Sequence, residues 1–366
     1  MNTKEIVFSS RQVDFMRELR ERVSAYFEHN HISESGNARI VVKSLFMLAL
    51  YVVPYVLMLT GMLVTPSGIL AAWFIMGFGM AGLGMVVMHD ANHGSYTASR
   101  HLNKWLGKTL YLLGGYPPTW RHQHNRMHHG FTNIDGFDED IGPVEILRFS
   151  PHKRRRKIHR FQHLYAWFFY GLMTLSWVIM KDYKQLSGYR KQGVSLTSRN
   201  NYTLLFLDLI SAKIVYYLLM LVLPVLLLPV PWYIPVLGFV IMHFVSGLVL
   251  GTIFQTAHVV PTSEYPLPDE EGNLEHNWAV HQLSTTSDFA RKNKVLSWLI
   301  GGLNFQVEHH LFPNISHVHY PRIAPIVEET ARKYDLPYSV QPTFGKAVAA
   351  HFRMLRALGR KAEVTR

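Results

Sequence analysis

Two long stretches of the chain, residues 44–88 and 214–263, contain no charged side chain. A soluble helix interrupts its apolar stripe with charge every turn or two, whereas a bilayer core of about 30 Å takes about 20 helical residues. Each stretch is long enough for two spans, and turn residues interrupt each near its middle, Pro-Ser-Gly at 66–68 and three prolines between 229 and 235. The pattern predicts an all-α integral membrane protein with two hairpins of transmembrane helices, at residues 42–63, 68–88, 204–228 and 234–256.

A third apolar stretch, Leu164 to Met180, is about 17 residues long and therefore short for a span. A fifth span would also place the histidine-rich motifs on opposite sides of the membrane. We therefore expect this stretch to form an interfacial helix. Residues 1–38 predict a polar helix without a secretory signal. Because no repeat or low-complexity run divides the chain, we expect residues 1–366 to form a single domain.

Of the 37 Lys and Arg residues, Lys43 lies at the start of the first predicted span and Lys213 within the third, the others lie outside the spans, and neither hairpin turn carries one. By the positive-inside rule, both termini and residues 1–41, 89–203 and 257–366 are cytosolic, which predicts a multi-pass protein of the inner or plasma membrane if the source is bacterial. The chain has a net charge of +12, and its basic residues lie beside the apolar spans. At that position we expect them to contact anionic lipid head groups rather than nucleic acid. The cluster from Lys153 to Lys157 fits either a membrane surface or the phosphates of an acyl carrier.

The chain has no cysteine and 21 histidines. The absence of cysteine excludes disulfides, thiolate metal sites, cysteine-bound iron–sulfur clusters and thiol catalysis. The histidines lie in clusters along the chain, and their imidazoles are the remaining candidates for metal ligands. His89 and His93 follow the second predicted span at an i,i+4 spacing, which places both imidazoles on one helix face.

Two further clusters repeat this chemistry. In the segment from His122 to His129, an α-helix places His124 and His128 on one face and turns His129 about 100° away, so that one helix could serve two metal ions. Gln306-Val307-Glu308-His309-His310 follows the Gly301-Gly302 turn, and His258 stands alone at the end of the fourth predicted span.

Tetrahedral zinc needs only four ligands, whereas the candidate ligands number eight and so predict two ions: His89, His93, His124, His128, His129, His258, His309 and His310. Nitrogen ligands without thiolates favour a pair of redox-active ions such as iron, although a two-zinc hydrolase stays open. Asp90 and Glu308 are candidates to accept hydrogen bonds from the second ring nitrogens of ligating histidines. The acidic run of Asp135, Asp138, Glu139 and Asp140 is expected in a loop near the site, where it could orient histidines. Other histidines are expected to be structural: His29, His31, His152, His159, His163, His243 and His351.

With these residues in view, the sequence resembles the membrane fatty acid desaturases, and most closely their front-end, linoleoyl-CoA desaturase-like branch. The first box of that family, His-Asp-x-x-His, matches His89 to His93. The second box matches His124, His128 and His129. The third matches Gly301 to Pro313, with Gln306 where other branches have a histidine.

The resemblance implies a four-span protein whose cytosolic helical cap carries the histidine boxes around a non-haem di-iron centre. Such a centre uses O₂ and two external electrons to introduce a cis double bond into an acyl chain carried on CoA or on a lipid. By the same resemblance His258 matches an isolated ligand, and Gln306 binds through its carbonyl oxygen or through water. His281 could either support a metal ligand through a hydrogen bond or belong only to a loop. His122 and His276 are weaker candidates for a role at the metal site.

The chain departs from many front-end members because it has no His-Pro-Gly-Gly haem motif. We therefore expect a separate electron donor, either a ferredoxin or a small haem protein with its reductase. The boxes alone leave a fatty acyl or lipid hydroxylase as an alternative. A histidine-rich metal transporter is a more distant one, since only His243 lies at the membrane depth typical of transport sites. Regioselectivity, chain length and substrate-binding residues are not assigned by the sequence.

Overall fold

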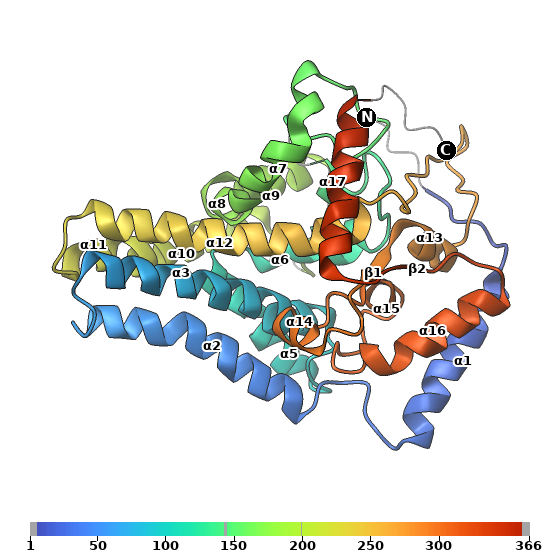
Figure 1. The fold of residues 1–366 in the computed structure, drawn as a ribbon, viewed down its shortest axis with the longest axis horizontal. Helices are drawn as coiled ribbons and strands as arrows, with labels where there is room; N and C mark the ends of the chain where they lie inside the picture. The colour runs from blue at the N-terminus through green and yellow to red at the C-terminus, as the bar shows by residue number, and fades with distance from the viewer. Residues whose placement is uncertain (1–5, 143–144, 199, 361–366) are drawn as a thin grey trace. The chain divides into compact units, whose positions relative to one another are not determined.

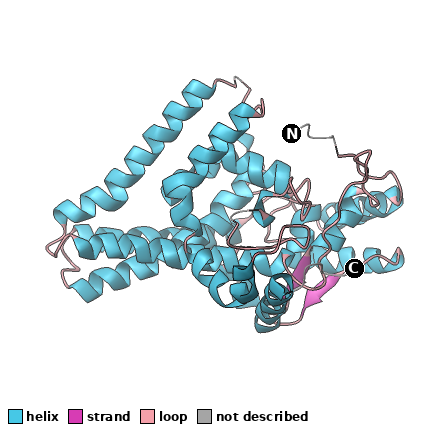
Figure 2. Ribbon diagram, turned by 90° about the horizontal axis from the view of Figure 1, so that it is seen from above, coloured by secondary structure: helices cyan, strands magenta, loops and turns pink. Residues whose placement is uncertain are grey.

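The computed structural model describes residues 6–142, 145–198 and 200–360. In this part of the chain nearly all regular structure is helical, with one small pair of strands (Figure 2). The chain divides into two compact units. Unit 1 comprises residues 1–36, 123–166 and 253–366, and unit 2 comprises residues 37–122 and 167–252.

The elements of unit 2 are α2 (Ala38–Leu59), α3 (Pro66–Leu83), η1 (Gly84–Met88), α4 (His89–His93), α5 (Arg100–Gly107), η2 (Lys108–Leu113), α6 (Pro117–Arg121), α8 (Met173–Ser176), η6 (Trp177–Lys181), α9 (Asp182–Lys191), α10 (Tyr202–Tyr217), η7 (Leu218–Val222) and α11 (Leu223–Leu227). Those of unit 1 are α1 (Val13–His29), η4 (Glu139–Ile141), η5 (Lys157–Phe161), α13 (Trp278–Thr285), β1 (Ser287–Phe289), α14 (Lys294–Leu299), α15 (Gln306–Leu311), α16 (Tyr320–Lys333), β2 (Ser339–Gln341) and α17 (Phe344–Arg360). Three helices have residues in both units: η3 (His122–His128), α7 (Gln162–Gly171) and α12 (Tyr233–His258).

Four helices in the described part of the chain are long and apolar enough to cross a membrane, as the sequence predicted. They run Ala38–Leu59, Pro66–His93, Tyr202–Leu227 and Tyr233–His258. The largest difference from the predicted ends is in the second helix, which continues to His93 instead of stopping at residue 88. The first histidine box is thus the last turn of an apolar helix.

Close backbone approach holds the long helices of unit 2 together (Figure 1). A Cβ atom added at Gly79 of α3 would lie 2.6 Å from the backbone nitrogen of Tyr51 in α2, so only glycine fits there. At Gly77, an added Cβ would lie 2.7 Å from the Val245 side chain of α12. Small residues at helix crossings are typical of membrane bundles, in which packing replaces the hydrophobic effect as the source of association.

The outward faces of these helices are apolar. Val42 and Leu45 of α2 are each 60% exposed, and Leu204 and Leu207 of α10 are 56% and 55% exposed. Large apolar side chains exposed in such numbers indicate contact with lipid rather than with water.

The apolar stretch at residues 164–180 forms two helical segments, Lys157–Gly171 and Met173–Lys191, bent by 55° at Leu172. By length and composition this pair is apolar enough to count as a fifth, broken span. The interfacial placement stays a prediction.

In unit 1, α1 is amphipathic rather than polar all round. Phe15, Leu19, Val23 and Phe27 recur every four residues and are buried in one hydrophobic cluster with residues of α13, α15 and α16. The predicted helix is present, but the prediction that it is polar missed its apolar stripe. The many charged residues on the other face of the helix hide that stripe in the composition.

The sequence did not predict the strand pair. β1 and β2 are parallel, three residues each, with Asp288 opposite Val340. Strands this short are beyond the reach of a periodicity argument. Their pairing places Asp288 beside Tyr338, whose hydroxyl donates a hydrogen bond to the Asp288 Oδ2 at 2.9 Å.

Candidate metal centre

The first histidine box, in unit 2, follows a π-helical turn. η1 leads directly into α4, which carries His89 and His93. Their ring centroids are 4.8 Å apart, which confirms that the two imidazoles share a face. Trp120 packs edge-on to both rings. Asp90 is buried beside them, with its Oδ1 3.9 Å from the His89 Nδ1.

The second box, in unit 1 from residue 123 onward, is a π-helix instead of the expected α-helix. The His129 amide donates to the carbonyl oxygen of His124, an i→i+5 hydrogen bond of 3.0 Å. This wider turn brings the His129 Nε2 to 3.3 Å from the His124 Nε2. The sequence argument assumed α-helical geometry, in which residues five apart do not share a face. π-turns are rare and occur frequently at functional sites.

Three segments of unit 1 bring further histidines together. His128 ends η3, His258 ends α12, and His310 lies on α15. The ring centroids are 4.8 Å apart for His128 and His258, 5.0 Å for His128 and His310, and 4.7 Å for His258 and His310. One ring nitrogen from each lies within 4.8 Å of the other two, and all three side chains are buried. This arrangement fits a bound metal ion.

The remaining candidate ligands of unit 1 adjoin this triad. His129 packs against His309 and His310, with ring centroids 4.6 Å and 4.4 Å apart. His124 stacks on His309 at 6.1 Å. Six of the eight histidines predicted as ligands thus form one buried cluster inside unit 1, and the other two form the first box of unit 2.

A second feature of these histidines is the way their Nδ1 atoms are held. The Nδ1 of His128 lies 3.2 Å from both carboxylate oxygens of Asp138, and that of His310 lies 2.9 Å from the Gln282 Oε1. The Nδ1 of His309 is 3.1 Å from the Tyr320 hydroxyl, and the Nδ1 of His258 is 3.4 Å from the Thr285 carbonyl oxygen.

An acceptor at Nδ1 fixes the tautomer with hydrogen on Nδ1 and leaves the Nε2 lone pair for a metal. The His258 Nε2 is buried and makes no hydrogen bond of normal geometry among the described residues, with the Gln306 side chain as its polar neighbour. A buried set of imidazole nitrogens oriented in this way suits iron, copper, nickel or zinc and does not suit magnesium or calcium. The residues therefore fit a transition-metal centre.

Negatively charged side chains lie beside His128. Burial alone would lower the pKa of His128, but the carboxylates of Asp138 and Asp140 outweigh it and raise the pKa to about 9. Asp138 is itself held by the backbone amides of Asn133 and Asp140, each at 2.9 Å. The acidic run that the sequence placed near the site thus supplies the partner of one histidine.

Comparison with known proteins decides the class. Residues 65–342 match the family model described as "Fatty acid desaturase". The chain belongs to the fatty acid desaturase family. It is 32% identical to a Synechocystis protein named sn-1 linoleoyl-lipid 6-desaturase, over 98% of this chain and 99% of that protein. It is 33% identical to an Arthrospira platensis protein of the same name, over 97% and 95% of the two chains. It is 36% identical to an acyl-lipid (8-3)-desaturase of Physcomitrium patens, over 94% of this chain and 72% of that protein.

The resemblance drawn from the histidine boxes is thereby confirmed. The chain is a membrane fatty acid desaturase and hence an oxidoreductase. The histidines of the first desaturase box are the pair that lies together in unit 2. Those of the second and third boxes lie together in unit 1.

Gln306 opens α15, and its side-chain Nε2 donates to the Leu303 carbonyl oxygen at 2.8 Å. This bond leaves the amide oxygen as the atom that can serve as a ligand. Glu308 is buried next to Tyr338 and Asp288. Its Oε1 lies 2.7 Å from the Tyr338 hydroxyl, and burial, with the neighbouring Asp288, raises the pKa of Glu308 well above the usual value. Glu308 therefore anchors the third box to the strand pair.

Among the described residues, the other histidines lie outside the groups of side chains that could hold a metal. His281 is buried on α13 with its ring edge-on to Phe8, and burial lowers its pKa to about 4. His122 packs against Tyr189, and the carbonyl oxygen of His276 accepts from the Ser9 amide. The histidines predicted to be structural make local contacts, including His152 with Tyr265, His159 with Glu145, His243 with Tyr216 and Thr174, and His351 with Val259.

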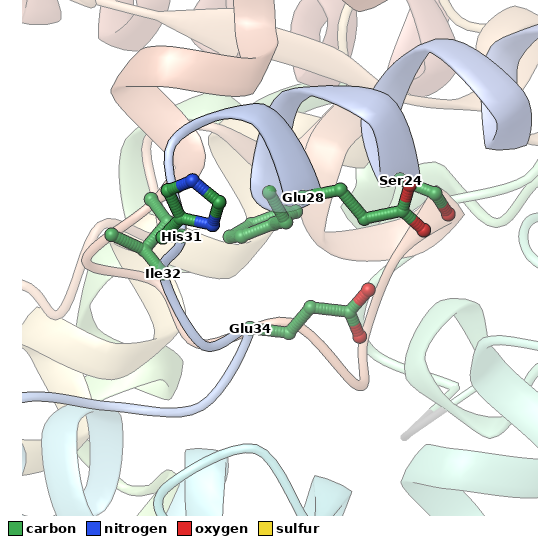
Figure 3. A pocket seen from close by; sticks show the side chains of 6 residues that line it. Ser24, Glu28, His31, Ile32 and Glu34 are labelled. Carbon is green, nitrogen blue, oxygen red and sulfur yellow. The ribbon is translucent and has the colours of Figure 1, made fainter.

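An open hollow beyond the end of α1 also carries a histidine and carboxylates. Ser24, Glu28, His31, Ile32 and Glu34 line it together with Phe27 (Figure 3). In the described part of the chain these side chains form no group of potential metal ligands. His31 is therefore left with the structural role that the sequence assigned to it.

Sequence reasoning missed the partners Gln282, Tyr320 and Thr285, because none belongs to a motif. Gln282 directly follows His281, and its Oε1 contacts the candidate ligand His310. Only the folded arrangement of α13 and α15 reveals this.

Proposed function

We propose that the chain introduces a cis double bond into the acyl chain of a membrane lipid, using O₂ and two electrons from a separate protein at a non-haem di-iron centre. The observation that carries the proposal is the cluster of buried histidines with their Nδ1 atoms held by neighbouring groups. Iron is the metal because family membership calls for oxygen chemistry and imidazole ligands suit it.

The ligands would be the eight histidines of the three boxes and the α12 terminus, with the Gln306 amide oxygen as a further candidate. Bound iron supplies the activation of O₂ that lets a strong C–H bond be broken. The chain's own residues fix the imidazoles: Asp138 holds His128, Gln282 holds His310, and Tyr320 holds His309. Their burial keeps bulk water from the reacting carbon atoms.

A lipid carrier is favoured over CoA by the names of the relatives, which describe acyl-lipid and linoleoyl-lipid desaturases. The electron donor would be a ferredoxin or a small haem protein. The charge distribution supports two hairpins with both termini, and residues 1–41, 89–203 and 257–366, on the cytosolic side. In this arrangement residues 1–366 work as one domain with a helical cap.

Fatty acid analysis of a host with defined lipids tests the proposal. Expression of the chain should yield a new cis-unsaturated fatty acid in the membrane lipids. His128→Ala should lower its amount at least about hundredfold through loss of one iron ligand, while membrane insertion is unchanged. The control is His29→Ala, which removes an exposed histidine of α1 and should leave the product unchanged. A hydroxylated fatty acid would contradict the proposal in favour of a hydroxylase, and an unimpaired His128→Ala would contradict the ligand assignment.

A further inference from the structure

Unit 2 has a groove of about 320 Å³ along α10 that the metal centre does not use. Its volume lies at the lower end of the range of small-molecule sites. The residues that line it come from α2, η2, α10 and η7 and include Tyr51, Tyr111, Asp208, Val215, Tyr216 and Leu219. Since α10 and η7 belong to a membrane-spanning helix, the groove opens toward lipid.

One end of the groove is polar. Asp208 lies in the second turn of α10, and its exposed carboxylate accepts a hydrogen bond from the Tyr111 hydroxyl at 2.9 Å. The rings of Tyr111 and Tyr116 are 6.1 Å apart beside it. An ionisable group within a membrane-spanning helix is rare and marks a functional site by default. An exposed carboxylate at this depth is suited to a cation, which it attracts directly.

The other end is apolar in spite of its tyrosines. The Tyr51 hydroxyl donates to the Leu112 carbonyl oxygen at 2.7 Å, and the Tyr216 hydroxyl lies 3.0 Å from the His243 Nε2. With their hydroxyls engaged by the protein, both residues contribute ring surface to the wall. Val215 and Leu219 complete an apolar surface and are 53% and 46% exposed.

The length of the groove fits one leaflet of a bilayer. From Asp208 to Met220 the helix rises about 18 Å at 1.5 Å per residue, and half of a bilayer core is about 15 Å thick. The polar end lies nearer the start of the span and the apolar end nearer its middle, in the order in which a lipid presents its head group and its chain.

We propose that this groove binds one membrane phospholipid, with its acyl chain along α10 and an ammonium head group at Asp208. Charge complementarity commits the site to an ammonium lipid such as phosphatidylethanolamine, because an anionic head group would be repelled by the carboxylate. The proposal goes beyond desaturation, and lipid binding can be measured without turnover.

Native mass spectrometry of the full-length protein tests the groove, with dioleoyl phosphatidylethanolamine and dioleoyl phosphatidylglycerol as the probes. Val215→Trp fills the groove, and Ile214→Trp is its matched control, since both residues are 53% exposed and only Val215 lines the groove. Val215→Trp should lower the affinity for phosphatidylethanolamine about tenfold relative to Ile214→Trp. Equal losses in the two variants would show ordinary lipid contact and overturn the site.

The head-group preference is tested by Asp208→Asn. The wild type should bind phosphatidylethanolamine about tenfold more tightly than phosphatidylglycerol, in line with one hydrogen bond to a charged group. Asp208→Asn should abolish this preference and spare phosphatidylglycerol binding. A preference that survives Asp208→Asn, or tighter binding of a galactosyl diacylglycerol, would overturn the ammonium assignment.

A labelling measurement covers the case in which a tryptophan variant folds poorly. Because the chain has no cysteine, Val215→Cys and Ile214→Cys can each carry a single fluorophore. Brominated phosphatidylethanolamine in vesicles should quench the label at position 215 at a lower mole fraction than the label at position 214. Identical quenching curves would overturn the groove as a lipid site.

Discussion

At the scale of single residues, the spacing of the boxes predicts the ligands but only part of what holds them. His128, His258 and His310 lie close together. The spacing of the histidines and the resemblance to the desaturases had suggested all three as ligands. The acidic run was expected near the site, and Asp138 indeed bonds His128. Gln282 and Tyr320 could not be predicted as partners, because hydrogen-bond acceptors of ligating histidines follow no sequence interval.

The role of Asp138 can be tested by Asp138→Asn, which keeps the shape of the side chain and removes its charge. We expect iron affinity to fall about 10- to 100-fold, as is usual when the partner of a ligating histidine is lost. Asp135→Asn is the control, because Asp135 pairs with Lys153 at 3.8 Å and not with a candidate ligand. Titration of each metal-free variant with ferrous iron measures its iron affinity. Equal affinities in the two variants would rule out the orienting role of Asp138.

His351 gives a prediction on acid stability. Burial lowers its pKa to about 4, and its Nδ1 lies 2.8 Å from the Val259 carbonyl oxygen. Since the unfolded chain binds this proton near pH 6.5 and the folded chain does not, the stabilisation is complete above pH 6.5. It is lost as pH falls toward 4, by about 3 kcal/mol in the free energy of unfolding.

His351→Asn retains an N–H donor for Val259 and does not titrate. Its free energy of unfolding in mixed micelles should therefore fall less between pH 6.5 and 4 than that of the wild type. Parallel pH profiles for the two proteins would show that His351 makes no such contribution.

At the scale of elements, long uncharged runs predicted the four long apolar helices well, because burying apolar side chains in lipid dominates local propensity. The π-turns were not predictable. η1 and η3 adjoin or contain the first two boxes, yet an i→i+5 hydrogen bond leaves no signature in apolar periodicity. The same holds for β1 and β2, which tertiary packing creates from three residues each.

The contact between α2 and α3 at Gly79 can be tested by one methyl group. Gly79→Ala places a Cβ 2.6 Å from the backbone of Tyr51, and we expect it to cost about 1–3 kcal/mol in the free energy of unfolding. Gly188→Ala on α9 has open space around its Cβ and should be neutral or stabilising by up to about 1 kcal/mol. Unfolding in mixed micelles compares the two. A stable Gly79→Ala protein would mean that the helices pack less closely.

At the scale of the whole molecule, family membership follows from the boxes and their order along the chain, and the comparison with known desaturases confirms it. The segments of unit 1 lie far apart in sequence, at residues 1–36, 123–166 and 253–366, and no local pattern predicts that they fold together. Neither box spacing nor charge predicts substrate specificity.

The measurement that tests the account most directly is the metal content of the purified chain together with the fatty acids of the membrane from which it was purified. We predict about two irons per chain, as eight histidine ligands imply, and a new cis double bond in the acyl chains of the lipids. Zinc in place of iron, without a new unsaturated fatty acid, would contradict the account.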